Sequence, residues 1–224
     1  EWASFFSLNI IMLITYCDDI DFSSFVDPQI LEFLLLKTDD DHFYHRYISL
    51  KIITNLIIQY NEVYVFFSQN GLAEKLIPAT VFKNDEDKSE FKDQDNREAN
   101  IFETISYIAR IITKDNLFSS EEAPILWNTS QFVINNGETK SVVNAIATLG
   151  YMAQNGYLDN FDEDTMEYFK IIPSDSNDAF ESFRFFLSCI PNVEAFFAEL
   201  IERGIMEDIM YSIQFKEINS ETAY

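Results

Sequence analysis

The fold is decided by a stretch that occurs twice near the start of the chain: residues 6–11 read FSLNII and residues 48–53 read ISLKII. The same spacing of large apolar residues returns in three later segments. Apolar side chains at positions i, i+3 and i+6 lie on one side of an α-helix and can be buried together. The triplets are Leu8, Ile11 and Ile14; Leu50, Ile53 and Leu56; Ile105, Ile108 and Ile111; Val143, Ile146 and Leu149; and Phe183, Phe186 and Cys189.

These triplets predict five long helices that stack side by side, at about residues 2–17, 43–60, 97–114, 138–155 and 177–190. Their first members lie 42, 55, 38 and 40 residues apart. The longest interval contains residues 83–98, a charged run in which Phe91 is the single large apolar residue. We interpret this run as a flexible insertion, since it cannot bury itself. Without it the period is about 40 residues, as in α-helical repeat proteins.

Shorter helices are predicted between the long ones from capping and turn residues. Asp27-Pro28 places an N-cap residue before a proline at the first helical position. The run 119–122 resembles a capping box for a helix that extends to about Asn136-Gly137. Gly71 separates a helix at 61–70 from one at 72–82. Each unit is thus interpreted as a short, a middle and a long helix. Two further segments are predicted to be helical, at 161–172 and at 192–218 with a turn at Gly204.

Composition excludes several classes of protein. Five glycines and five prolines in 224 residues are too few for the turns of an all-β fold, and 47% hydrophobic residues suffice for a buried core. A net charge of −23 disfavours nucleic acid as a partner. The longest apolar stretch, 5–16, is shorter than the roughly 20 residues that span a bilayer. Cys17 and Cys189 have apolar neighbours in sequence and suit a reducing compartment, so we expect a cytoplasmic or nuclear protein.

A three-helix unit of this length resembles the armadillo repeat. Residues 61–77, NEVYVFFSQNGLAEKLI, resemble its first helix, glycine turn and second helix, and residues 49–56, SLKIITNL, resemble its third helix. Residues 196–206 repeat the first-to-second helix turn. The resemblance implies one domain over residues 1–224, an all-α right-handed superhelix of four to five degenerate repeats. It also implies that the third helices line a concave groove for extended protein segments.

The armadillo proteins that import nuclear cargo carry a Trp, and an Asn four residues later, on each third helix. The Trp positions here hold Asn9, Lys51, Ser106, Asn144 and Arg184, and the Asn positions hold Leu13, Asn55, Arg110, Thr148 and Ser188. Because only Asn55 matches, binding of basic import signals is not expected. The three basic members of these positions, with two of the asparagines beside them, form a hypothetical groove that would attract carboxylates and hold a peptide backbone. They are Lys51, Asn55, Arg110, Asn144 and Arg184, and we expect them to be exposed on one face.

The sequence contains none of the common motifs for catalysis or cofactor binding considered next. His42 and His45 form an HxxH pair beside three aspartates, but no further ligands follow at a fixed spacing, so we expect residues of a loop and a helix start. The acidic runs at 85–87 and 159–164 lack the glycine and closing glutamate of an EF-hand. Nucleotide-binding glycine motifs and a GxSxG motif do not occur. We therefore predict no catalytic residues, no metal and no cofactor.

The sequence favours a non-catalytic protein–protein interaction scaffold that binds an extended segment or a helix of a partner along its groove. One alternative is a structural or autoinhibitory regulatory domain of a larger cytoskeletal protein, similar to the armadillo domain of formins. Another is capture of a basic partner by the acidic surface. An enzyme of unrecognised type is the third class. The identity of the partner and the oligomeric state do not follow from the sequence.

Overall fold

The computed structural model describes residues 7–12, 26–83, 97–170, 172 and 176–211. Within these ranges the regular structure is helical and contains no strand, which confirms the predicted all-α class for this part of the chain. Residues 7–12 and 205–211 are helical. The other helices are α2 (Pro28–Lys37), α3 (Phe43–Gln59), α4 (Val63–Gln69), α5 (Leu72–Lys75), the 3₁₀ helix η2 (Pro78–Thr80), α7 (Arg97–Lys114), α8 (Ala123–Asn136), α9 (Thr139–Gln154), α10 (Glu163–Tyr168), α12 (Asn177–Cys189) and α13 (Val193–Glu202).

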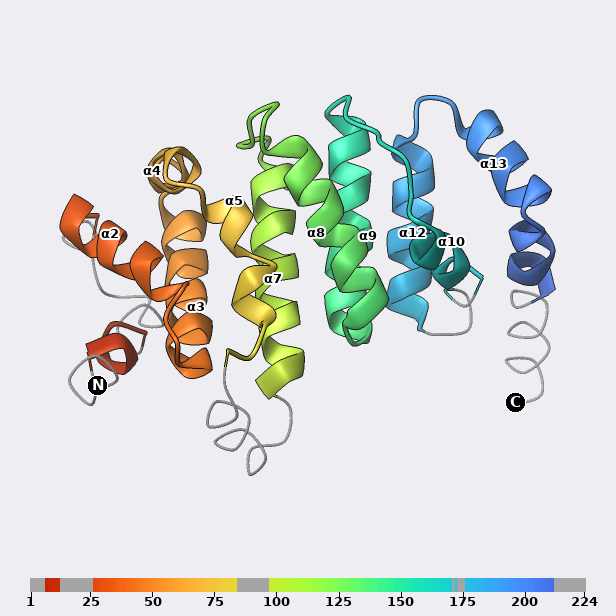
Figure 1. Cartoon of the computed structure of the whole chain (residues 1–224). Helices are drawn as coiled ribbons and strands as arrows, with labels where there is room; N and C mark the ends of the chain where they lie inside the picture. Colours follow the sequence, from red (N-terminus) through yellow and green to blue (C-terminus); the bar gives the residue numbers. More distant parts are fainter. Residues whose placement is uncertain (1–6, 13–25, 84–96, 171, 173–175, 212–224) are drawn as a thin grey trace, which may run out of the picture.

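Four long helices, α3, α7, α9 and α12, lie side by side in a row and run in the same direction (Figure 1). Helix α7 packs against α3 and α9, and α12 packs against α9. Their bounds agree with the four predicted helices to within one residue at each end. Of the fifth, predicted at 2–17, the structure describes residues 7–12, which are helical. The apolar triplets therefore located the long helices correctly.

The shorter helices pack on this row and on one another. Helix α2 contacts α3 and α4, α5 contacts α8, and α8 contacts α7, α9 and α10. The prediction of three helices per unit is wrong between α7 and α9, since α8 is the only helix in residues 115–138. Pro124 lies at the start of α8, and residues 125–136 contain no glycine or proline that would divide it.

Two other predicted helices are shorter than the sequence indicated. The helix expected at 72–82 ends at Lys75 and is followed by η2, because Pro78 has no N–H to donate to the carbonyl group of Glu74. The helix expected from residue 161 begins at Glu163, because the Asp162 carboxylate accepts a hydrogen bond from the Thr165 amide at 2.7 Å and caps it. Gly71 has a φ of +76° and separates α4 from α5 as predicted.

The predicted caps at 27 and 119–122 are confirmed. Asp27 accepts from the Gln29 amide at 2.8 Å, ahead of Pro28. The Ser119 hydroxyl accepts from the Glu122 amide at 3.2 Å, and the Glu122 carboxylate accepts from the Ser119 amide at 2.9 Å. This reciprocal pair is a capping box, which satisfies two amides in the turn that leads into α8.

Glu122 also connects the start of α8 to α4. Glu122 is 5% exposed, and its carboxylate accepts hydrogen bonds from the Tyr64 hydroxyl at 2.6 Å and the Ser68 hydroxyl at 2.8 Å. Burial and the adjacent Glu122 carboxylate raise the pKa of Tyr64 well above its ordinary range, so its hydroxyl stays a donor. A buried carboxylate is tolerated here because hydroxyl and amide donors surround it.

Arg46, near the start of α3, joins two loops. Its fully buried guanidinium donates to the carbonyl oxygens of Asp40, Asp41, Ala79 and Val81 at 2.7–3.1 Å. It also lies over the Phe43 ring, 5.2 Å from its centroid. One side chain from α3 therefore fixes both the α2–α3 turn and the segment that follows η2.

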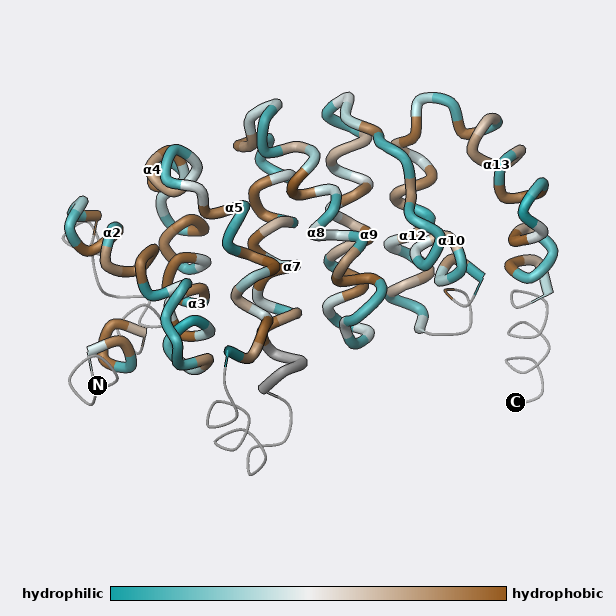
Figure 2. The backbone as a smooth tube through the Cα atoms, in the orientation of Figure 1, coloured by the Kyte–Doolittle hydropathy of each residue, from teal (hydrophilic) through white to brown (hydrophobic). Residues whose placement is uncertain are grey.

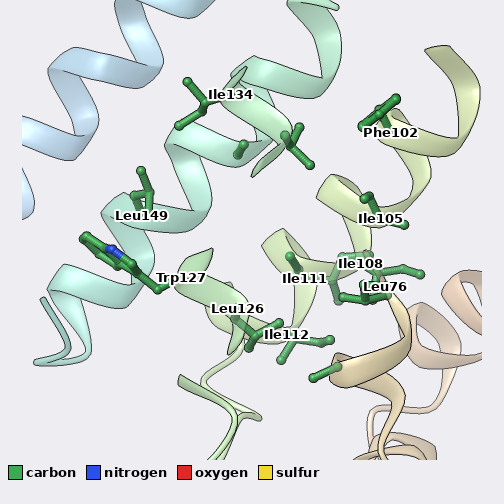
Figure 3. Packing of buried hydrophobic residues seen from close by; sticks show 14 of the residues in the cluster. Leu76, Phe102, Ile105, Ile108, Ile111, Ile112, Leu126, Trp127, Ile134 and Leu149 are labelled. Atoms are coloured by element: carbon green, nitrogen blue, oxygen red, sulfur yellow. The ribbon is translucent and has the colours of Figure 1, made fainter. Parts of the chain in front are cut away.

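The buried apolar residues form one cluster that extends from Leu8 to Ile209. The triplets of α3, α7 and α12 contribute to it, and Figure 3 shows Ile105, Ile108 and Ile111 of α7 beside neighbouring helices. Val143 and Cys189 are partly exposed. Apolar and polar segments alternate along each helix (Figure 2), as expected for helices buried on one side. A single domain over residues 1–224 stays a prediction.

The predicted insertion at 83–98 lies largely outside the described residues. At its first residue, the Lys83 ammonium donates to the Asp39 carbonyl at 2.6 Å and to its carboxylate at 2.9 Å. At its other end, α7 already begins at Arg97. Both edges of this segment are therefore attached to the helical body.

Helix α9 approaches α12 closely at Gly150. A Cβ atom at this position would lie 2.7 Å from the Phe185 ring and 3.2 Å from the Phe186 Cα atom. The Phe185 ring in turn packs on Tyr151, with 4.9 Å between ring centroids. Glycine is thus required by the spacing of the two helices, not by the backbone conformation.

We predict that Gly150→Ala destabilises the protein by about 1–3 kcal/mol, because the added methyl group overpacks the α9–α12 contact. At an uncrowded helix position the same change stabilises by up to about 1 kcal/mol. Urea denaturation distinguishes the two signs. In a Phe185→Ala background, which removes the obstructing ring, the penalty should become smaller. Stabilisation in both backgrounds would mean that α9 and α12 lie farther apart.

Candidate functional site

The row of long helices presents a stripe of partly exposed side chains on one side. On α7 the stripe consists of Glu103, Tyr107, Arg110 and Lys114, which are separated by four, three and four residues. Residues at this spacing lie on one side of a helix. The core triplet of α7 is buried on the opposite side. Side chains of the neighbouring helices continue this exposed stripe across the row.

A pocket of about 550 Å³ crosses the stripe and is lined by residues of four helices. Its lining combines two lysines and two carboxylates with amide, hydroxyl and apolar side chains. The lining residues are Lys51, Thr54, Asn55 and Ile58 of α3; Glu103, Thr104 and Tyr107 of α7; Thr139, Lys140, Val143 and Asn144 of α9; and Asp178 of α12. The pocket is therefore an open groove that runs from α3 to α12, and we call it the α3–α12 groove.

Three of the five predicted site residues, Lys51, Asn55 and Asn144, line this groove. Arg110 does not line it, but its guanidinium Nη1 donates to the Asn144 Oδ1 atom at 2.8 Å. Asn144 is only 9% exposed, so the expectation that all five residues are exposed is wrong at this position. It is buried because α7 and α12 both pack against α9.

Arg184 lies apart from the groove. Its side chain is 63% exposed, and its Nη1 atom contacts the Glu181 carboxylate at 2.9 Å on the same helix. An exposed pair of this kind contributes little to stability. The expectation that Arg184 makes no ion pair within the protein is therefore wrong, and the α12 side of the groove is represented by Asp178 instead.

The register inferred from the sequence differs by about one residue on α7. Ser106, the residue at the Trp position of α7, is 1% exposed, and the groove is lined by Glu103, Thr104 and Tyr107. On α9, Thr148 is fully buried, and Lys140 and Val143 line the groove beside Asn144. Sequence reasoning missed Tyr107 and Lys140. The polar spacing of residues 103, 107, 110 and 114 was a signal that could have identified the α7 stripe.

Lys51 is held by an aromatic neighbour on its own helix. Its ammonium nitrogen lies 5.6 Å from the centroid of the Tyr47 ring. A cation over an aromatic face is attracted by the ring quadrupole without losing its charge. Within the described residues, neither Lys51 nor Lys140 forms an ion pair with a carboxylate. The positive charges of both lysines are therefore not neutralised by neighbouring carboxylates.

The histidine pair lies where the sequence predicted, at the α2–α3 turn. His42 is the residue before α3, and the His45 Nδ1 atom lies 3.1 Å from the Asp40 carboxylate. The described ranges contain no group of three or more His, Cys, Asp or Glu side chains arranged to hold a metal ion. Burial by itself would raise the pKa of Asp40, but hydrogen bonds from Lys37, the His42 amide and His45 lower it from 3.8 to about 2.

Comparison of the chain with protein-family models, curated proteins and solved structures gave no match. These comparisons therefore add no support to the resemblance to armadillo repeats. Among the described helices, none combines the length and the apolar character that crossing a membrane requires.

We predict that Asp40→Asn destabilises the protein by about 1 kcal/mol at neutral pH, after allowance for the partial solvent exposure of this carboxyl group. A carboxyl whose pKa is lowered by folding stabilises the fold above its unfolded pKa. That contribution disappears as the pH falls through the folded value. The difference in unfolding free energy between wild type and variant should therefore be constant above about pH 4.5 and decrease between pH 4 and 2.

Urea denaturation of both proteins across this pH range measures the effect. Taking the difference between the two unfolding free energies removes the acid dependence that both proteins share, which is expected for a chain with a net charge of −23. A difference that does not change with pH would contradict the assigned network around Asp40.

Proposed function

We propose that this chain is a non-catalytic protein–protein interaction module of armadillo-like architecture. Its ligand is an extended segment or a helix of a partner protein, bound in the α3–α12 groove. The proposal is supported most by the groove lining, which comes from four consecutive helices of the row. In repeat proteins each unit contacts only its neighbours, so a row of units exposes a long continuous surface.

The spacing of the row suits an extended peptide. Packed helices lie about 8–10 Å apart, and an extended chain advances about 3.4 Å per residue. A bound segment would therefore pass from one helix to the next about every three residues. The amides of Asn55 and Asn144 lie in the lining and can bond a peptide backbone. An intracellular location agrees with this proposal, since Cys189 is a free thiol.

The test is a selection of extended peptides on the folded chain, followed by affinity measurements on groove variants. We predict that the double variant Lys51→Glu/Lys140→Glu weakens binding of the selected peptides at least tenfold, because both side chains lie in the lining. The matched control is Lys170→Glu, which also reverses a lysine but lies after α10, outside the lining.

Circular dichroism should show equal helix content in all three proteins. Peptides that bind the double variant as tightly as wild type would contradict the proposal. If such peptides were basic, the acidic surface would be the binding region instead.

A further inference from the structure

The contact between Arg110 and Asn144 fixes the orientation of a buried amide in the groove. A guanidinium group only donates hydrogen bonds, so the atom of Asn144 that faces it at 2.8 Å is the carbonyl oxygen. The NH₂ group of the same amide is consequently the part left for the groove, which Asn144 lines. Asn144 thus presents a donor there, and its ligand must be an acceptor.

Two lysines of the same groove, Lys51 and Lys140, also require a ligand that is an acceptor. In the described part of the chain, several basic side chains lie within 4 Å of a carboxylate oxygen, among them Lys37, Lys75, Lys83, Lys170, Arg184, Arg203 and the His45 ring. Lys51 and Lys140 do not, although Glu103 and Asp178 line the same groove. In a chain with 38 acidic and 15 basic residues, lysines without a carboxylate partner within 4 Å are notable. An acceptor that carries a negative charge would satisfy both lysines and the Asn144 amide.

The groove also exposes large apolar side chains beside these donors. Ile58 is 48% exposed and Tyr107 is 40% exposed, and Val143 lies with them in the lining. Ile58 lies two helical turns after Lys51 on α3. A ligand that buried these side chains would gain hydrophobic free energy in addition to its polar contacts.

We propose that the α3–α12 groove recognises an internal segment of a partner protein in which one Asp or Glu lies close to one large apolar residue. The carboxylate accepts from the Asn144 amide and pairs with Lys140, one helical turn away on α9, while the charge of Lys51 on α3 attracts it from across α7. The apolar side chain packs on Ile58 and Tyr107. Arg110 is a positioning residue that acts through Asn144. This inference rests on the proposed function, since it names the chemistry of the segment that the groove binds.

The charge of the whole protein restricts the segment further. A net charge of −23 repels a strongly acidic peptide at long range, whereas a single carboxylate can be stabilised locally by two lysines. Glu103 and Asp178 in the lining add to this repulsion. The expected segment is therefore neutral overall or weakly basic apart from its one acidic residue.

The experiment selects a phage-displayed library of random 15-residue peptides on the full chain and measures dissociation constants of labelled peptides by fluorescence anisotropy. The selected peptides should share an Asp or Glu within about three residues of a Leu, Ile, Phe, Trp or Met. Replacing that acidic residue by its amide should weaken binding at least tenfold. Ile58→Ser should weaken it at least threefold, whereas Leu36→Ser, a more exposed apolar control on α2, should not.

The variant Asn144→Asp tests the positioning role. Its carboxylate can still accept the hydrogen bond from Arg110, so the melting temperature should be kept, but the donor is lost and a negative charge faces the ligand. Binding should fall at least tenfold. Arg110→Met should weaken binding while Arg110→Lys restores part of it. A drop in melting temperature that accounts for each loss of binding would overturn the positioning role.

The experiment distinguishes failure of this inference from failure of the proposed function. Peptides that depend on Lys51 and Lys140 but carry no essential carboxylate would overturn this inference and leave the proposed function intact. A selection that yields no peptide sensitive to any groove variant would overturn both.

Discussion

Helix α9 is buried on nearly every side, and the row of long helices depends on this packing. It lies between α7 and α12 and is covered by α8. The helix carries several small buried residues, among them Ala145, Ala147, Gly150 and Ala153, and α12 approaches it closely at Gly150. Small side chains allow close approach of helix backbones, and a close-packed interface has little room for change. The position of α9 therefore sets the spacing of the row, and with it the width of the groove.

Two hydrogen bonds, at different positions along the helix axes, fix α7 relative to α9. Near the middle, Arg110 donates to Asn144, and at the upper ends the Asn155 amide donates to the Thr113 carbonyl at 2.8 Å. Both contacts are partly buried, so losing one partner would leave a polar group poorly solvated. The apolar contacts hold the helices together, and these two hydrogen bonds specify their register. The same register brings Tyr107 of α7 and Val143 of α9 into one lining.

The sequence predicted the long helices well because burial of α3, α7 and α12 follows the 3.6-residue period. It predicted the direction of the exposed stripes less well. Residues at i, i+3 and i+6 lie at successively different angles around the helix axis. A triplet therefore defines a wide sector of the helix surface, and it fixes the residues on the exposed side only to within about one position. The exposed side is hardest to assign from sequence on α7, because neighbouring helices on both sides bury Ser106 as well as the triplet. Lys51, Asn55 and Asn144 lie in one lining, whereas Arg184 lies on the end helix of the row, which has α9 as its one long neighbour.

We propose that α7, α9 and α12 form one cooperative unit on which the groove is built. Native-state hydrogen exchange of the free protein tests this most directly, because it measures the opening free energy of each segment. The account predicts that amides in the middle of α7, α9 and α12 exchange together at the highest free energy, and that amides of α2 and α13 exchange at lower values. Exchange of the α9 amides through an opening that leaves α7 and α12 protected would contradict it.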